Sequence, residues 1–279
     1  ADTTPTTQVV QAKDVEKFGG WEIDFNEIQF VRELGKGAFG VVYLCRWRNT
    51  DCATKQCVQR FLKEAENVKS LKPHPNVCTV LGVCTNPKYP ICIVMEYLPD
   101  GNLEDLIYEK KIEIDARRVI EFAKDVASGM THLHAENILH CDLACRNLLV
   151  ASKGANKYQI KIADFGLSRV LSAETYTVSK QATFPTRWTA PETFRNGKIS
   201  RANDVWSFGI VLWEMMEARR PYTEYNNTEV IQQMLEGYRL PRPKMTIPDS
   251  LWNLIQMCWD SDPNNRPSFN DIYLHLSHM

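Results

Sequence analysis

The chain has 279 residues, 44% of them hydrophobic, and a formal net charge of −1. That length is enough for the core of one bilobal domain or of two small ones. A nearly neutral charge argues against a nucleic-acid-binding protein, which needs a basic surface. No apolar run approaches the roughly 20 residues of a membrane helix, and the first residues do not resemble a signal peptide. We therefore expect a globular chain without a membrane span.

Nine cysteines are scattered along the chain without a C-x-x-C pair. This usage favours reduced thiols in a cytoplasmic setting over disulfides or a zinc site. The chain begins at Ala1 rather than Met, as a piece excised from a longer protein would, so regulatory modules are expected outside it. Residues 1–20 are polar, rich in Thr and end in two glycines. They predict a poorly ordered linker before a compact domain at residues 21–279.

A glycine-rich run at residues 35–42 follows a strand-like segment at residues 28–34 and has the pattern G-x-G-x-x-G. This pattern also occurs in dinucleotide-binding folds, where a helix follows the glycines. Here a β-prone run at residues 41–45 follows, which predicts a hairpin and argues against a dinucleotide-dependent oxidoreductase. Glycines in such a hairpin let backbone amides approach phosphate groups closely. Lys55, in the next β-like segment, is a candidate cation for the same phosphates.

Helical and strand-like patterns alternate in the next part of the chain. Residues 60–71 and 115–134 are predicted to form helices, because their apolar residues recur at the spacing of one helix face. Two strands are expected at residues 77–83 and 90–97. The longer helix leads into the most informative stretch of the sequence.

Residues 140–147, with the sequence H-C-D-L-A-C-R-N, lie between two apolar stretches, which predicts a loop held at both ends by buried strands. This loop contains the carboxylate of Asp142, the guanidinium of Arg146 and the amide of Asn147. A second acidic run, D-F-G, begins at Asp164. An isolated Asp or Asn on a loop most often serves turn geometry. Two carboxylates and an amide at strand ends can instead hold a divalent metal on oxygen ligands while one carboxylate orients a hydroxyl.

Taken in order, these motifs resemble those of the protein kinases: the glycine-rich loop, V-A-I-K around Lys55, H-R-D-x-x-x-x-N at residues 140–147, and D-F-G. The resemblance covers about residues 21–277. It implies an α+β, bilobal protein-kinase fold. A small antiparallel-sheet N-lobe with its helix C is expected at about residues 21–98, and a larger helical C-lobe at about residues 99–279. The resemblance also implies ATP, Mg²⁺ and protein substrates.

The same resemblance assigns roles to individual residues. Asp142 is the implied general base or orienter of the substrate hydroxyl, with Arg146, Asn147 and Lys55 as further catalytic residues. Asn147 and Asp164 are the implied Mg²⁺ ligands. The implied nucleotide-binding residues are Leu34, Gly35, Lys36, Gly37, Gly40, Val42, Ala53, Lys55, Glu64, Met95, Glu96, Leu98, Asp105, Leu149 and Asp164.

Five of these residues have more specific implied positions. Met95 resembles the gatekeeper, and the backbones of Glu96 and Leu98 are expected to hydrogen-bond adenine. Leu149 resembles the residue under the adenine ring. Asp105 either meets the ribose or is a solvated helical carboxylate.

Glu64 is the implied ion-pair partner of Lys55, chosen over Glu66 because it directly precedes an alanine, as in helix C of tyrosine kinases. Only nine positions separate Lys55 from Glu64, whereas the family usually has a longer connection. The connection is therefore a departure from the pattern.

Two segments indicate tyrosine as the phosphate acceptor. Arg146 matches the A-A-R-N of tyrosine kinases, whereas serine/threonine kinases place Lys where Ala144 stands. Residues 184–192, F-P-T-R-W-T-A-P-E, closely resemble a tyrosine-kinase motif, and Pro185 and Trp188 would form a platform for a phenolic side chain. The resemblance thus implies a protein tyrosine kinase. A serine/threonine or dual-specificity kinase of the tyrosine-kinase-like group and a pseudokinase scaffold are the alternatives.

Residues 167–183 are the activation-loop candidate, and Tyr176 stands where the family is autophosphorylated. Phosphate there ordinarily pairs with a basic cluster that includes the Arg of H-R-D. Cys141 occupies that position in this chain. We therefore predict that activity depends less on phosphorylation of Tyr176 than is usual, and the same departure keeps the pseudokinase alternative open.

The last part of the chain predicts a helical platform. Residues 204–214 are apolar almost all round, as in a buried helix, and resemble the D-V-W-S-F-G helix whose Asp bonds to the catalytic-loop backbone. Further helices are expected at residues 228–236 and 251–259. The resemblance implies a buried ion pair of Arg266 with Glu192. The W-E-I motif at residues 21–23 resembles the start of the kinase domain in non-receptor kinases. This resemblance favours a cytoplasmic kinase over the intracellular part of a receptor.

Overall fold

The computed structural model describes residues 19–37, 40–57, 71–165, 167–171, 173, 175–177 and 184–279. The predicted linker before residue 19, most of the predicted helix at residues 60–71 with Glu64, and parts of the activation-loop candidate lie outside the described residues. The chain divides into two compact units. The first comprises residues 1–73 and 78–98, and the second comprises residues 74–77 and 99–279.

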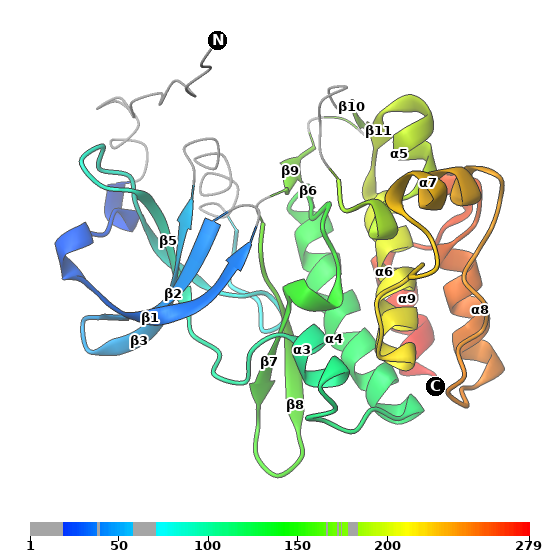
Figure 1. Ribbon diagram of the computed structural model, residues 1–279, viewed down its shortest axis with the longest axis horizontal. Coiled ribbons are helices and arrows are strands. Elements are labelled where there is room, and N and C mark those ends of the chain that lie inside the picture. Colours follow the sequence, from blue (N-terminus) through cyan, green and yellow to red (C-terminus); the bar gives the residue numbers. More distant parts are fainter. Residues whose placement is uncertain are drawn as a thin grey trace. The chain divides into compact units, whose positions relative to one another are not determined.

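The first unit contains a five-stranded antiparallel sheet with the strand order β1-β2-β3-β5-β4 (Figure 1). The glycine-rich run does form a β-hairpin, because Gly37 pairs with Gly40 and a strand, not a helix, follows. Arg48 and Asn49 both have positive φ, of 47° and 63°, which is the geometry of a tight turn that matches the twist of its strands. The strands are β1 (Ile28–Gly37), β2 (Gly40–Trp47), β3 (Thr50–Cys57), β4 (Val80–Cys84) and β5 (Ile91–Glu96).

The register of this sheet separates its side chains onto two faces, because directly paired residues of antiparallel strands point to the same side. Buried Cys45, Cys52 and Val94 form one apolar cluster with Ile23 and Ile28, the latter at the start of β1. The other face therefore carries the residues that alternate with these in β2, β3 and β5. It includes the paired residues Val42, Lys55 and Ile93, and Ala53 with Met95.

The described residues of the second unit are mainly helical and also form three two-stranded sheets, β7–β8, β6–β9 and β10–β11. Helix α4 packs on α9 and on β8, and α6 packs on α8. The helices are α3 (Leu103–Tyr108), α4 (Ala116–Ala135), α5 (Pro191–Asn196), α6 (Arg201–Glu217), α7 (Asn227–Leu235), α8 (Asp249–Cys258) and α9 (Phe269–Ser277). The short strands are β6 (Ile138–Leu139), β7 (Leu148–Ser152), β8 (Tyr158–Ile162), β9 (Arg169–Val170), β10 (Tyr176–Thr177) and β11 (Lys198–Ile199), and the 3-10 turns are η1 (Gly19–Trp21), η2 (Phe25–Glu27), η4 (Cys145–Asn147), η5 (Thr186–Trp188) and η6 (Pro263–Asn265).

Two glycines inside long helices allow close packing in the second unit. A Cβ on Gly129 of α4 would lie 2.7 Å from the backbone oxygen of Asn76, and one on Gly209 of α6 would lie 2.5 Å from the Trp259 indole nitrogen. Real Cβ atoms do not approach so closely, so larger residues would push these elements apart. None of the described helices is both long enough and apolar enough to cross a bilayer.

The helix and strand predictions that fall on described residues are correct in type, but their ends differ by a few residues. Asp115 is the N-cap of α4 rather than its first residue, because its side chain accepts a hydrogen bond from the Arg118 amide at 2.8 Å. Asn226 and Glu229 form a capping box that starts α7 at Asn227. The other corrected elements are β4, β5 and α8, which were predicted at residues 77–83, 90–97 and 251–259 and have the bounds given above.

Candidate active site

Asp204, near the start of α6, binds the backbone of the loop that follows β6. Its two carboxylate oxygens accept hydrogen bonds from the backbone amides of His140 and Cys141, each at 2.9 Å, and His134 Nε2 lies 2.9 Å from Oδ2. Burial alone would raise the pKa of Asp204, but the hydrogen bond and charge of His134, with help from His140 and the Cys141 amide, lower it below its usual value. The predicted bond from the helix Asp to the loop backbone is confirmed.

Asp142 lies within this anchored loop and is 5% exposed. Its backbone amide donates to Nδ1 of His140 at 3.2 Å, and its Oδ1 pairs with Nη2 of Arg146. The guanidinium of Arg146 in turn lies 4.5 Å from the centre of the Trp188 ring. Burial raises the pKa of Asp142 above its usual value, while Arg146 and His140 oppose the shift. A buried carboxylate with a raised pKa is a suitable general base.

The side chain of Asn147 binds the backbone of the same loop. Its side-chain nitrogen donates to the carbonyl oxygen of Asp142 at 2.7 Å, so its side-chain oxygen is the atom left for a further ligand. Strands β7 and β8 are antiparallel, and the Ala163 amide donates to the Asn147 carbonyl at 2.9 Å. This pairing brings Asn147 next to the segment that begins at Asp164, whose φ of 60° is unusual for a residue other than glycine. The negative charge of Asp164 also contributes to the raised pKa of Asp142.

The donor set at this strand end fits a small, hard cation. One amide oxygen and one carboxylate are ligands that Mg²⁺ prefers when phosphates and water supply the rest of its shell. Within the described parts of the chain, no three His, Cys, Asp or Glu side chains gather into a complete metal centre. An ion held by Asn147 and Asp164 would therefore need ligands from a bound substrate.

His140 and Phe165 join the loop to the segment that follows β8. His140 is fully buried, and its Nε2 lies 3.0 Å from the carbonyl oxygen of Ala163. Its ring centre lies 5.6 Å from that of Phe165. These contacts join the loop to the D-F-G segment, although its glycine, Gly166, lies outside the described residues.

The first unit contributes the predicted phosphate-binding lysine. Lys55 is only 4% exposed, and it shares one face of the sheet with Val42, Ala53 and Met95. A buried ammonium is costly unless anions or hydrogen bonds compensate it, so Lys55 is not an ordinary solvated lysine. The predicted partner Glu64 lies outside the described residues.

The hairpin residues Leu34, Gly35, Lys36 and Gly37 lie in β1, where a bulge between Glu33 and Gly35 shifts the register. Gly40 opens β2 with a φ of 145°, a backbone conformation that residues with side chains rarely adopt. The glycine at this position is therefore required by the shape of the hairpin.

Two of the residues predicted to contact adenine or ribose, Glu96 and Asp105, make local hydrogen bonds. Glu96 ends β5: its amide donates to the Thr79 carbonyl at 2.9 Å, and its carboxylate accepts from the Thr79 amide at 2.7 Å. Leu98 is the last residue of the first unit, whereas Leu149 lies on β7 of the second. Asp105 is bound to Asn102 through two hydrogen bonds, of 2.8 and 2.9 Å, at the start of α3. Asn102 caps the helix by accepting from the Asp105 amide, and the Asp105 carboxylate accepts from the side-chain nitrogen of Asn102, a contact that the sequence did not predict.

Glu214 of α6, which binds the backbone of the loop, was not predicted from the sequence as part of the site. Its carboxylate accepts hydrogen bonds from Tyr108, Cys145 and Trp188. The signal was present, because Glu214 is a charged residue that ends a run predicted to be a buried helix. The predicted ion pair is confirmed: both terminal nitrogens of Arg266 contact Glu192, at 2.7 and 2.9 Å.

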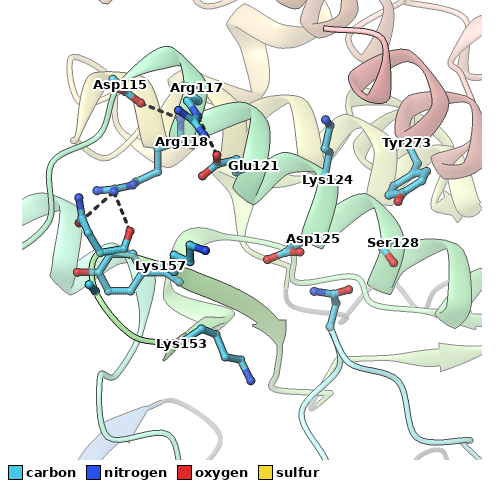
Figure 2. A pocket seen from close by; sticks show the side chains of 14 residues that line it. Asp115, Arg117, Arg118, Glu121, Lys124, Asp125, Ser128, Lys153, Lys157 and Tyr273 are labelled. Atoms are coloured by element: carbon cyan, nitrogen blue, oxygen red, sulfur yellow. Dashed lines mark hydrogen bonds and ion pairs between the residues drawn. The ribbon is translucent and has the colours of Figure 1, made fainter.

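A polar pocket of about 850 Å³ lies elsewhere in the second unit, along α4 and the β7–β8 turn (Figure 2). Arg117 pairs there with Glu121, and Arg118 donates to Asn156. None of the predicted site residues that the structure describes lines this pocket. Its opposite charges partly neutralise one another, so it is not a candidate for phosphoryl transfer.

The comparisons with known proteins agree with this geometry. The family model described as protein tyrosine and serine/threonine kinase matches residues 28–276. The chain is 35% identical over 284 aligned positions to tyrosine-protein kinase Fer of Mus musculus, covering 98% of this chain and 34% of that protein. It is 38% identical over 269 positions to tyrosine-protein kinase Abl of Drosophila melanogaster (93% of this chain, 16% of that protein) and 36% identical over 262 positions to cytoplasmic tyrosine-protein kinase BMX of Mus musculus (91% and 39%). The chain thus spans about a third of the length of the first of these relatives, and it belongs to the protein tyrosine and serine/threonine kinase family.

Proposed function

We propose that this chain is an ATP-dependent protein tyrosine kinase, which transfers the γ-phosphoryl group of ATP to tyrosine hydroxyls of protein substrates. The observation that carries the proposal is the arrangement of Asp142, Arg146 and Trp188. The guanidinium pairs with the carboxylate and stacks on the indole of the F-P-T-R-W segment. An Arg fork held in this way orients the carboxylate toward a phenol, and the position that carries Lys in serine/threonine kinases is Ala144.

In this proposal the first unit supplies most of the nucleotide contacts. Lys55 binds the α- and β-phosphates, with Glu64 as its partner, and the backbones of Glu96 and Leu98 hydrogen-bond adenine. Met95 closes the back of the adenine site, and the glycine-rich hairpin covers the phosphates. The remaining contacts are assigned to Leu34, Gly35, Lys36, Gly37, Gly40, Val42 and Ala53 of the first unit and to Asp105, Leu149 and Asp164 of the second.

The chemistry is assigned to the second unit. Asn147 and Asp164 would hold Mg²⁺, which when bound neutralises charge on the phosphates. Asp142 orients the tyrosine hydroxyl and accepts its proton as the phenolic oxygen bonds to the γ-phosphorus. The bond from that phosphorus to the β–γ bridging oxygen breaks, and ADP leaves with the electron pair. Positioning and charge neutralisation supply most of the rate enhancement.

The biological setting is also a proposal. We infer a cytoplasmic enzyme with protein substrates and with regulatory modules outside this chain. The relatives are considerably longer than this chain, which supports the presence of such modules. A chain that acts on proteins, and not on nucleic acids, is consistent with the net charge of −1.

Phosphoamino-acid analysis tests the proposed reaction most directly. The purified chain is incubated with Mg²⁺, radiolabelled ATP and a tyrosine-containing protein, beside an Asp142→Asn variant. We expect phosphotyrosine from the wild type and a loss of at least ~10³-fold in the variant, because the carboxylate that orients and deprotonates the hydroxyl is gone. Phosphoserine or phosphothreonine would identify the tyrosine-kinase-like alternative. Incorporation equal to that of the variant would favour a pseudokinase.

A further inference from the structure

Glu214 is a fully buried carboxylate near the end of α6. It accepts three hydrogen bonds: from the Tyr108 hydroxyl at 2.8 Å, the Cys145 amide at 3.2 Å and the Trp188 indole nitrogen at 3.0 Å. A buried carboxylate is costly unless its oxygens are hydrogen-bonded, so these contacts fix its position firmly. The charge also raises the pKa of the Tyr108 hydroxyl, after burial itself, so that this hydroxyl remains a donor.

Two of the three donors lie on either side of Arg146. Cys145 directly precedes it in η4, and the Trp188 ring lies under its guanidinium, 4.5 Å away. Trp188 is 4% exposed, and its carbonyl accepts a hydrogen bond from Ser207 at 2.7 Å. Glu214 therefore holds both the backbone next to Arg146 and the aromatic surface on which its side chain rests.

Arg146 in turn contacts the carboxylate of Asp142. Its Nη2 pairs with Oδ1 of Asp142, while its side chain is still 30% exposed. A long side chain that is partly exposed loses a fixed geometry easily unless a surface supports it. We propose that Glu214 is a positioning residue that holds Arg146 against Asp142 through the Trp188 indole and the Cys145 amide. This inference rests on the proposed phosphoryl transfer to a hydroxyl.

The proposal predicts a defined kinetic effect for Glu214→Met. Methionine keeps roughly the length of the side chain but removes Oε2, the oxygen that accepts from both the Cys145 amide and the Trp188 indole. Glutamine would not serve, because its one side-chain oxygen can still accept both bonds. We expect kcat to fall by roughly 10- to 100-fold, a loss typical of a small misplacement of a catalytic group. The KM for ATP should be unchanged.

A second variant, Trp188→Phe, keeps an aromatic ring but deletes the indole N–H that binds Glu214. It should lower kcat in the same way as Glu214→Met, without changing the KM for ATP. In an Arg146→Ala background, neither substitution should lower kcat further, because the group that they position is absent. Additive losses in that background would overturn the proposal.

Two matched substitutions separate positioning from general loss of packing. Glu192→Met changes a partly buried glutamate of the same unit, the partner of Arg266. Trp213→Phe deletes another buried indole N–H, which donates to the Pro241 carbonyl at 2.8 Å. Both should lower the melting temperature with little change in kcat. If they lower kcat as much as the Glu214 variant does, Glu214 is merely a structural residue.

A measurement that does not need turnover distinguishes failure of this inference from failure of the proposed function. Nitrogen NMR of the arginine side chains reports whether the Arg146 guanidinium is held in place, with its resonance assigned by its loss in Arg146→Ala. We expect the Arg146 Nε–H to exchange with water faster in Glu214→Met and Trp188→Phe than in the wild type, whether or not the chain phosphorylates tyrosine. An unchanged exchange rate in both variants would disprove the positioning role.

Discussion

Cys141 is the residue at which this chain departs most clearly from the kinase pattern. It has a φ of 64° and lies in an apolar cluster with Leu139, Leu171, Tyr176 and Phe184. Burial, followed by the charge of Asp204, raises the pKa of its thiol well above the usual value, so the side chain is neutral. Tyr176 therefore packs against a neutral apolar cluster at the position where the family pattern places a guanidinium.

This environment leads to a prediction about regulation. Tyr176→Phe keeps the ring that packs in the cluster and removes only the hydroxyl that would be phosphorylated. We expect this variant to retain activity within roughly 3-fold of the wild type, because Cys141 offers no charge to pair with a phosphate. Activity on a tyrosine peptide, measured before and after autophosphorylation, checks this.

The reverse change should create the missing dependence. In a Cys141→Arg background, Tyr176→Phe should lower activity by ~10-fold or more, because phosphate–Arg pairs normally order this loop. Activity of Tyr176→Phe at the background level, in the presence of Cys141, would contradict the prediction.

The strand ends that carry the candidate site residues could be predicted because residue identities and spacing carry that information. Asp142, Asn147 and Asp164 are polar side chains at the ends of apolar strands, and the β7–β8 pairing does bring the last two segments together. Glu214 could not be placed in the same way. Its partners Tyr108, Cys145 and Trp188 lie 106, 69 and 26 positions away, and only the folded chain brings them together.

At the scale of elements, α6 is the support on which the catalytic loop is built. Asp204 at its start binds the backbone of His140 and Cys141, and Glu214 near its end binds the backbone of Cys145. The loop is thus held at two points by one buried helix. A loop fixed in this way keeps catalytic groups in place at little entropic cost during the reaction.

The anchoring predicts a stability effect for Asp204→Asn. The variant loses the charge-assisted bond with His134 and leaves one loop amide without an acceptor. We expect the free energy of unfolding to fall by about 2–4 kcal/mol, as when a buried charged hydrogen bond is broken. Denaturant unfolding at pH 7 measures this. Asp249→Asn, at an exposed ion pair with Arg242, is the matched control and should change stability by less than about 0.5 kcal/mol.

The same residue predicts the shape of the pH dependence. The pKa of Asp204 is lower in the folded chain than in the unfolded one, so its contribution is present above the unfolded pKa and is lost as pH falls through the folded pKa. The stability difference from wild type to Asp204→Asn should therefore narrow below about pH 4, the ordinary range of an aspartate. A difference that stays constant down to pH 2 would show that charge is not the stabilising factor.

Element types were predictable because hydrophobic periodicity determines them, but element ends depend on single side chains. Asp115 and Asn226 set the first residue of their helices by accepting backbone hydrogen bonds, and these bonds depend on local geometry that hydrophobic periodicity does not include. The glycine-rich hairpin was predicted more closely, since a β-prone run after Gly40 excludes a helix. Positive φ at Gly40 then explains why glycine is needed there.

At the scale of the whole molecule, the order of the motifs carried the family assignment. No single motif was sufficient: G-x-G-x-x-G alone also fits dinucleotide-binding folds. The phosphate acceptor is harder to predict, because tyrosine and serine differ in reach and not in functional group. The contacts of Trp188 in the folded chain are therefore needed to infer which hydroxyl accepts the phosphate.

The proposed function requires residues from both units, which leads to a test on the intact chain. A ligand that binds only the folded state stabilises it by about 2.7 kcal/mol at 100 times its Kd, which corresponds to several degrees in melting temperature. ATP with Mg²⁺ should therefore raise the melting temperature of the wild type. Lys55→Met should abolish most of the increase, and Asp164→Asn should abolish the part that depends on Mg²⁺.

Lys153→Met is the matched control for Lys55→Met, because Lys153 is exposed on the β7–β8 turn and lines the polar pocket of Figure 2. It should leave the ATP-induced increase unchanged, since a solvated lysine contributes nothing to a nucleotide bound elsewhere. Burial is the property that distinguishes the two: Lys55 is 4% exposed within a sheet. If Lys55→Met melts like the wild type with and without ATP, the buried lysine has no part in nucleotide binding, and the phosphate assignment fails.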